Sequence, residues 1–213
     1  MSDIRDHWPQ LLAAHRDICE QLLEAYGEPG RGYHSIEHLQ EVFERIDAIL
    51  AGEAAGSAGQ GATHDIDLDA VLLAAWFHDA VYDTEGNNEE RSAALAERGL
   101  TNAEVPKELV DEVARLVRLT ATHKVAADDL NGQVLCDADL GILAADEERY
   151  AEYTQGVRRE YQHVSDEDFR RGRARILRDL LAAPSLFNTS FAKQHWEKRA
   201  RANVEQELTE LEA

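Results

Sequence analysis

Apolar residues recur every three or four positions along most of the chain, which is the spacing of amphipathic α-helices. The pattern predicts a first helix with Asp6 as N-cap and Pro9 in its first turn, ending at Gly27. Ser35 is a candidate cap for a second helix, which has a long apolar stripe. The stretch that follows, at about residues 51–66, is rich in Gly and Ala and lacks periodicity. We expect it to be a flexible loop within one domain.

In the middle of the chain the sequence pattern predicts two more helices, each with a recognisable start signal. Asp67 is a suitable N-cap for a helix with Leu68 on its inward face, and this helix leads into a conspicuous apolar run. Asn87 and Glu90 have the spacing of a capping box, which would open a helix that stops at Gly99.

The remaining sequence continues the helical pattern. Pro106 predicts the start of the next helix, and a later one begins near Asp137, an apparent N-cap, with Asp139 on its inward face. Ser165 opens a further helix with Ile176 among its inward residues, and the last stripe runs through the C-terminal segment. No strand pattern or repeat is present, so we predict an all-α, single-domain helical bundle over residues 1–213.

Composition agrees with this prediction and narrows the functional classes. Of 213 residues, 44% are apolar, enough to fill the core of one domain, and only 4 are proline. No apolar run reaches the roughly 20 residues that a membrane span needs. Cys19 and Cys136 are too few for a disulfide framework. Without a signal-peptide pattern at the N-terminus, we expect a cytoplasmic protein.

The charge is strongly negative but unevenly distributed. A net charge of -20 argues against a general nucleic-acid-binding surface. The segment between Arg158 and Arg201 nevertheless holds 11 of the 22 Lys and Arg residues. This basic segment is either a set of solvated helix faces or a place that receives a small anion.

Three short motifs carry the candidate chemistry. His34 and His38 are one helical turn apart, His78 and Asp79 end an apolar run, and Asp139 enters a later helix from its core face. Taken alone, the His pair and the His–Asp pair are better explained as solvent-exposed or helix-capping residues. Together they predict a metal site in which His38, inside its helix, is a ligand and His34, at the helix start, donates a proton.

Mixed imidazole and carboxylate ligation suits a divalent transition metal better than calcium. Such an ion activates water and polarises a phosphoryl oxygen, so the expected reaction is hydrolysis of a phosphate ester. The expected cofactor is Mn, Fe, Co, Zn or Ni, with Mg and a second ion left open. No nucleophile elbow or glycine-rich phosphate loop is present.

The order His38, His78–Asp79 and Asp139 resembles the H…HD…D signature of the HD superfamily of metal-dependent phosphohydrolases. Residues 33–38, 76–83, 88–93 and 197–203 resemble a bacterial subgroup known mainly as predicted phosphohydrolases. The first motif is also similar to the Tyr-His-Asn-x-x-His signature of cyclic nucleotide phosphodiesterases. The resemblance implies a phosphodiesterase-type bundle, with these four residues as metal ligands and His34 and Asp79 as catalytic residues.

The resemblance suggests several further residues. Ser35 stands where phosphodiesterases have Asn, and Asp83 stands where they have a second-site His. His123 resembles an extra histidine of two-metal members, although a helix-terminal His is an equal explanation. Glu89 or Glu90 would orient His34. Candidate phosphate contacts are Arg158, Arg173, Arg199 and Arg201.

Three hypotheses follow from the sequence. The leading one is an enzyme that cleaves a phosphomonoester or phosphodiester of a nucleotide or similar small molecule. The second is a non-hydrolytic metal- or nucleotide-binding sensor, and the third is a purely structural helical protein. The C-terminal amphipathic segment packs either internally or, in a homodimer, against a second copy.

Overall fold

The computed structural model describes residues 3–56, 65–84 and 86–213. Over these ranges the chain is all-α and contains no strand, which confirms the predicted fold class and the single helical domain. No described helix is both long and apolar enough to cross a bilayer. The elements are η1 (Ile4–His7), η2 (Gln10–Leu12), α1 (Arg16–Tyr26), α2 (Ile36–Gly56), α3 (Leu68–Phe77), α4 (Asn88–Asn102), α5 (Lys107–Leu119), α6 (Leu130–Leu140), η3 (Gly141–Ala144), α7 (Glu147–Glu160), α8 (Asp166–Ala182), α9 (Ser190–His195) and α10 (Glu197–Glu212).

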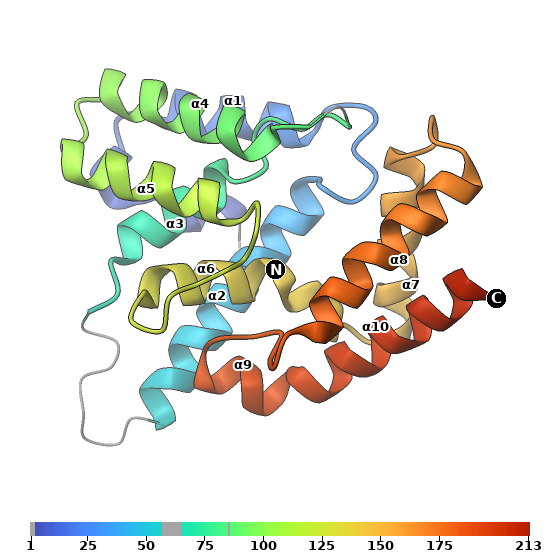
Figure 1. Cartoon of the computed structure of the whole chain (residues 1–213). Helices are drawn as coiled ribbons and strands as arrows, with labels where there is room; N and C mark the ends of the chain where they lie inside the picture. Colours follow the sequence, from blue (N-terminus) through green and yellow to red (C-terminus); the bar gives the residue numbers. More distant parts are fainter. Residues whose placement is uncertain (1–2, 57–64, 85) are drawn as a thin grey trace.

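Helices α2, α3 and α6 contact one another at the centre of the molecule (Figure 1). The predicted stripe of α2 is fully buried at Leu39, Val42, Phe43 and Ile46. α4 and α5 lie side by side and pack on α3, while α1 packs on α2 and α3. The central helices are therefore enclosed by others, which explains why α3 buries seven of its ten residues.

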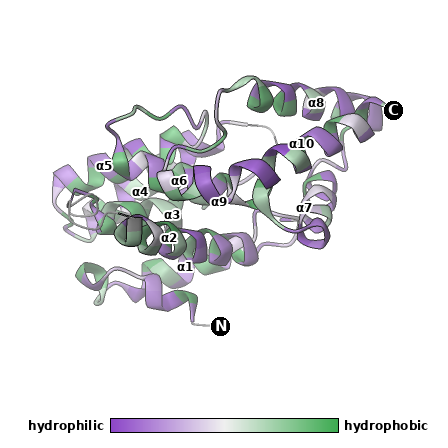
Figure 2. Cartoon of the chain, turned by 90° about the horizontal axis from the view of Figure 1, so that it is seen from below, coloured by the Kyte–Doolittle hydropathy of each residue, from purple (hydrophilic) through white to green (hydrophobic). Residues whose placement is uncertain are grey.

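The C-terminal helices enclose a second apolar cluster. Tyr150 of α7, Leu177 of α8 and Val204 of α10 meet there with η3. Trp196, between α9 and α10, packs against both clusters and so joins the two parts of the core. The outer helices α8 and α10 alternate between hydrophilic and hydrophobic segments, as expected when one face packs inward (Figure 2).

The N-terminal prediction of one helix from Asp6 to Gly27 was wrong in its first half. Two short 3₁₀ segments, η1 and η2, precede α1, and Asp3 rather than Asp6 caps the first of them. Pro9 has no backbone N–H and an extended ψ of 138°, so the helix cannot run through it. Gly27 does end α1.

The predicted loop at about 51–66 was wrong for residues 51–56, which form the last turns of α2. Tertiary contacts hold these turns: the Glu53 carboxylate accepts the Phe191 N–H at 2.7 Å, and the Phe191 ring lies where a Cβ on Gly52 would be. Residues 57–64, including His64, lie outside the described residues.

The predicted caps were partly correct. Asp67 and Ser165 accept backbone N–H groups at the starts of α3 and α8. Asn87 makes no such bond and has a left-handed φ of 63°, so the capping box with Glu90 is absent. α4 also continues past Gly99 to Asn102.

Two predicted inward residues are exposed instead. Leu68 is 46% exposed and Ile176 is 54% exposed. Both lie on helices whose other apolar residues reach the core. The predicted helical period was therefore correct, but the inward face predicted for each helix was too wide.

Asp137 is buried and does not cap a helix, contrary to the prediction. α6 begins seven residues earlier, where Asp129 caps it. The Asp137 carboxylate accepts the Thr189 N–H at 2.7 Å and its hydroxyl at 2.8 Å, together with the Asn188 N–H and amide group. Burial raises the pKa of Asp137, and these hydrogen bonds oppose the rise. Asp137 thereby attaches the segment before α9 to α6.

Replacing Asp137 with Ala should lower the free energy of unfolding by about 3 kcal/mol, because buried donors on Asn188 and Thr189 lose their acceptor. Urea denaturation followed by circular dichroism measures the change. Asp128→Ala is the matched control, since Asp128 is exposed just before α6, and it should change stability by less than about 0.5 kcal/mol. Equal stabilities for the two variants would contradict the assigned role.

Candidate metal centre

The first two histidines lie where the chain enters α2. His34 precedes the helix, and His38 is the third residue of its first turn, fully buried. The Nδ1 of His38 has no hydrogen-bond partner among the described residues, so its Nε2 makes the contacts toward the other motifs. The division between a buried His38 and a partly exposed His34 agrees with the sequence prediction.

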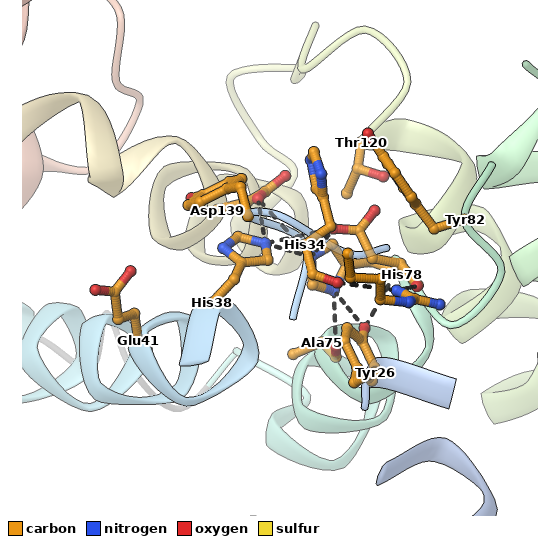
Figure 3. A network of polar contacts seen from close by, with 12 residues as sticks. Tyr26, His34, His38, Glu41, Ala75, His78, Tyr82, Thr120 and Asp139 are labelled. Atoms are coloured by element: carbon orange, nitrogen blue, oxygen red, sulfur yellow. Dashed lines mark hydrogen bonds and ion pairs between the residues drawn. The ribbon is translucent and has the colours of Figure 1, made fainter. Parts of the chain in front are cut away.

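His78 is the C-cap of α3, and its side chain is held by the helix it ends. Its backbone N–H bonds to the Ala74 carbonyl, and its Nδ1 lies 2.7 Å from the Ala75 carbonyl. Because a carbonyl only accepts, Nδ1 carries a hydrogen, and Nε2 is the nitrogen that faces the site. Figure 3 shows His78 above Ala75 and Tyr26, facing His38 and Asp139.

Asp139 reaches the same point from the last turn of α6. The Nε2 atoms of His38 and His78 are 3.1 Å apart, and Asp139 Oδ1 is 3.3 Å from the first and 3.8 Å from the second. These three ligand atoms all lie within 4.8 Å of one another. Ligands about 2.1 Å from one ion are about 3.0–3.5 Å apart in tetrahedral or octahedral arrangements. The three residues therefore form a group that could hold a metal ion.

Asp79 lies next to this group. Its Oδ2 atom is 3.2 Å from the Nε2 of His78 and 3.4 Å from the Nε2 of His38. Its backbone N–H donates to the Tyr26 hydroxyl, which fixes the residue after the end of α3. Asp79 is thus in contact with both histidines and is a fourth candidate ligand.

The electrostatic field at the group favours positive charge. Burial opposes protonation of His78, but the carboxylates of Asp79 and Asp139 outweigh it and raise the pKa of His78 to about 9. Burial also opposes ionisation of the two carboxyls, yet the neighbouring histidines hold the pKa of each well below its ordinary value. A field that attracts a proton to this degree also attracts a cation.

His34 is oriented by Glu160, a residue that the sequence analysis missed. Glu160 Oε2 is 2.8 Å from His34 Nδ1 and accepts the Tyr82 hydroxyl, while Oε1 accepts the backbone N–H groups of Gly32, Tyr33 and His34. The Glu160 side chain is 0% exposed. A signal was present, because Glu160 continues the buried stripe of α7 three residues after Val157.

The ion pair sets the charge of both partners. Burial opposes ionisation of Glu160, but the bond to His34 outweighs it and lowers the pKa of Glu160 to about 2. For His34, burial is outweighed by Asp79 and Glu160, and its pKa is raised. Glu89 and Glu90 do not have the predicted role of orienting His34. Glu160 contacts His34 Nδ1 instead, and Glu90 pairs with Arg118 on α5.

Two glycines allow α7 to approach the His34 turn. A Cβ on Gly32 would lie 2.3 Å from the Gly156 carbonyl oxygen, and a Cβ on Gly156 would lie 2.7 Å from the Gly32 carbonyl oxygen. The two backbones are therefore in direct contact, one turn before Glu160. Any side chain at either position would push α7 away from the turn.

Arg31 connects the first two motifs from inside the protein. Its guanidinium donates to the backbone carbonyls of His34 at 3.0 Å, Asp79 at 2.7 Å and Ala80 at 3.0 Å. Its side chain is only 3% exposed and lies against the rings of Tyr26 and Tyr82. Arg31 thus fixes the His34 turn relative to the end of α3.

His123 and Asp83, the predicted second-metal candidates, have different positions. His123 Nε2 lies 2.9 Å from Asp139 Oδ2, so its ring joins the edge of the group from the end of α5 rather than bonding to helix carbonyls. Its φ of 52° is left-handed, as often found just after a helix. Asp83 pairs with Arg91 of α4, and its N–H donates to Asn88.

Most of the arginines proposed for phosphate contact have structural partners. Arg158 bonds to Asp166 and to the carbonyls of Tyr161 and Val164. Arg201 pairs with Glu197 and bonds to two carbonyls at the end of α8. Arg199 is exposed on α10.

Arg173 differs because it lines a cavity of about 590 Å³, whose other lining residues come from the end of α6, η3, α7 and α8 among others. His34, His123 and Asp139 are among its lining residues, so a small molecule in the cavity would meet the His–Asp group at Asp139.

No protein-family model matches the sequence, and no match was found among curated proteins or solved structures. The site is therefore defined by its own geometry: a buried His38–His78–Asp139 group that could hold a metal ion of unknown identity.

Protein purified without chelator, or reconstituted with Mn²⁺ or Zn²⁺, should contain about one ion per chain by elemental analysis. Because the ion binds the folded state and not the unfolded state, it should raise the melting temperature, and EDTA should reverse the rise. His78→Ala and Asp139→Ala should remove both effects while retaining helical circular dichroism.

Exposed residues of the same types supply the controls. His163→Ala and Asp128→Ala should bind the metal like the wild type. The assignment of the ligands would be contradicted if the wild-type protein took up no metal after reconstitution. It would also be contradicted if His78→Ala or Asp139→Ala retained the metal.

Proposed function

We propose that the protein is a metal-dependent phosphohydrolase of HD type. The observation that carries the proposal is the convergence of His38, His78 and Asp139, of which Asp139 also lines a cavity together with His34. The finer assignment to HD-type enzymes rests on the order of the motifs, His38, then His78–Asp79, then Asp139, which resembles the H…HD…D signature.

Each residue has a role in this proposal. His38, His78, Asp79 and Asp139 would hold the metal, since the first three place their ligand atoms within 3.4 Å of one another and Asp139 is within 3.8 Å of both histidines. The ion would supply Lewis acidity, which polarises a phosphoryl oxygen and makes water more acidic. Arg31 keeps the His34 turn and Asp79 in fixed relation, as positioning requires.

His34 would donate a proton to the leaving oxygen. Glu160 engages its Nδ1, which leaves Nε2 as the nitrogen available to a substrate in the cavity. The raised pKa of His34 favours the protonated form that a general acid needs. Its side chain is 24% exposed, so it can take up a new proton from solvent after each turnover.

Metal-loaded protein should hydrolyse phosphate esters, and His34→Asn should lower kcat by about 10²- to 10⁴-fold, since proton donation contributes that much in other enzymes. Its metal content should not change, because His34 is not a ligand. Asp79→Asn should lose activity through weaker metal binding. Released phosphate or alcohol, measured by chromatography over a panel of monoesters and diesters, checks the result.

His163→Asn is the matched control for His34→Asn, because His163 is exposed on the loop before α8 and should leave kcat unchanged. Metal-loaded protein that leaves the whole panel intact would refute the enzymatic proposal. Recovery of bound but unchanged nucleotide in that experiment would instead favour a non-hydrolytic sensor.

A further inference from the structure

The cavity at the His–Asp group has the size of a small-molecule site. Its volume of about 590 Å³ exceeds what a phosphate needs and falls in the range of about 300–1,000 Å³ that is typical of ligand pockets. His34 and Asp139 are among its lining residues, and residues of η3, α7 and α8 make up much of the remainder. A phosphate ester with its phosphate at the metal group would therefore place its alcohol part along α7 and α8.

The wall along α7 and α8 is mainly apolar and partly aromatic. Tyr153, Tyr161 and Phe169 supply rings, and Leu143, Ile176 and Leu180 supply aliphatic side chains. Ile176 is 54% exposed, so it adds apolar surface to the lining at a position that also faces solvent. Such a surface stabilises an apolar body that contains rings better than it stabilises a sugar or an amino acid.

The cavity has little cationic charge for additional phosphate groups. Among the described residues that line it, Arg173 is the only Lys or Arg. Its guanidinium is already paired with Glu207 at 2.7 Å and bonded to the Tyr153 hydroxyl at 2.8 Å. Asp168, which also lines the cavity, adds negative charge. A triphosphate needs several guanidinium or ammonium partners, and these are missing from this lining.

We propose that the substrate is an ester carrying a single phosphate on an apolar, ring-containing alcohol rather than a polyphosphorylated nucleotide. This inference rests on the proposed function, because it places the phosphate at the His38–His78–Asp139 group. It adds that the α7–α8 side of the cavity, from Tyr153 to Ile176, selects the alcohol part.

The first experiment compares two alkyl phosphate esters that have similar leaving groups, with two nucleotides as further substrates. Metal-loaded protein is assayed with 2-(1-naphthyl)ethyl phosphate, ethyl phosphate, AMP and ATP. Because the two alkyl esters differ mainly in apolar area, kcat/KM should be about 10- to 100-fold higher for the naphthyl ester. It should also exceed the values for AMP and ATP. A preference for ATP or AMP, or equal values for the two alkyl esters, would overturn the inference and leave the proposed hydrolase function intact.

The second experiment uses a variant at the exposed rim. Ile176→Glu places a charge beside the apolar wall, and it should lower kcat/KM for the naphthyl ester at least 10-fold while changing ethyl phosphate less than 2-fold. Leu68→Glu is the matched control, because Leu68 is comparably exposed, at 46%, on α3 and does not line the cavity. Equal effects of the two variants would overturn the inference.

A binding measurement separates this inference from the proposed function. Calorimetry with the non-hydrolysable 2-(1-naphthyl)ethylphosphonate should show binding to metal-loaded protein that Ile176→Glu weakens about 10-fold and Leu68→Glu does not. If no ester is cleaved but the phosphonate binds in this way, the hydrolase proposal fails and the apolar site stands. If the esters are cleaved but the phosphonate does not bind, or Ile176→Glu binds it equally, the apolar site fails.

Discussion

The structure depends on the electrostatic balance among His38, His78, Asp79 and Asp139, which are brought together where α2, α3 and α6 meet. Moving charged groups away from water costs several kcal/mol each unless neighbours compensate. Here each carboxylate has at least one imidazole within 3.4 Å, so each negative charge lies beside a group that can carry a positive charge. The contacts among α2, α3 and α6 hold the segments that carry these side chains together.

Two charged residues outside the group hold the backbone that carries it. Arg31 binds three carbonyls of the motif segments, and Glu160 binds three consecutive N–H groups of the His34 turn. Both are nearly inaccessible to solvent, so their charges are directed to backbone dipoles rather than to water. The turn that carries His34 is thereby fixed from two directions without using either residue as a ligand.

The sequence predicted the fold class and the main contents of the site because both depend on local periodicity. The helical spacing placed Asp139 on an inward face, let His78 look inward from the end of its helix and put His38 at the edge of an apolar stripe. The structure brings these three residues together. It could not identify the partner of His34, since Glu160 lies 126 residues away and only the packing of α7 brings it close. Asp137 was misassigned for the same reason, because a cap and a buried acceptor for Thr189 look alike in sequence.

The contact between Gly32 and Gly156 makes the orientation of His34 depend on the absence of side chains at two distant places. One added methyl group at either position would widen the gap between α7 and the turn, and Glu160 would move with the helix. His34 would then keep its place in the chain but lose its fixed direction and its neighbouring negative charge. Chemistry at the cavity can thus be weakened by a substitution that touches no ligand, no proton donor and no part of the cavity wall along α8.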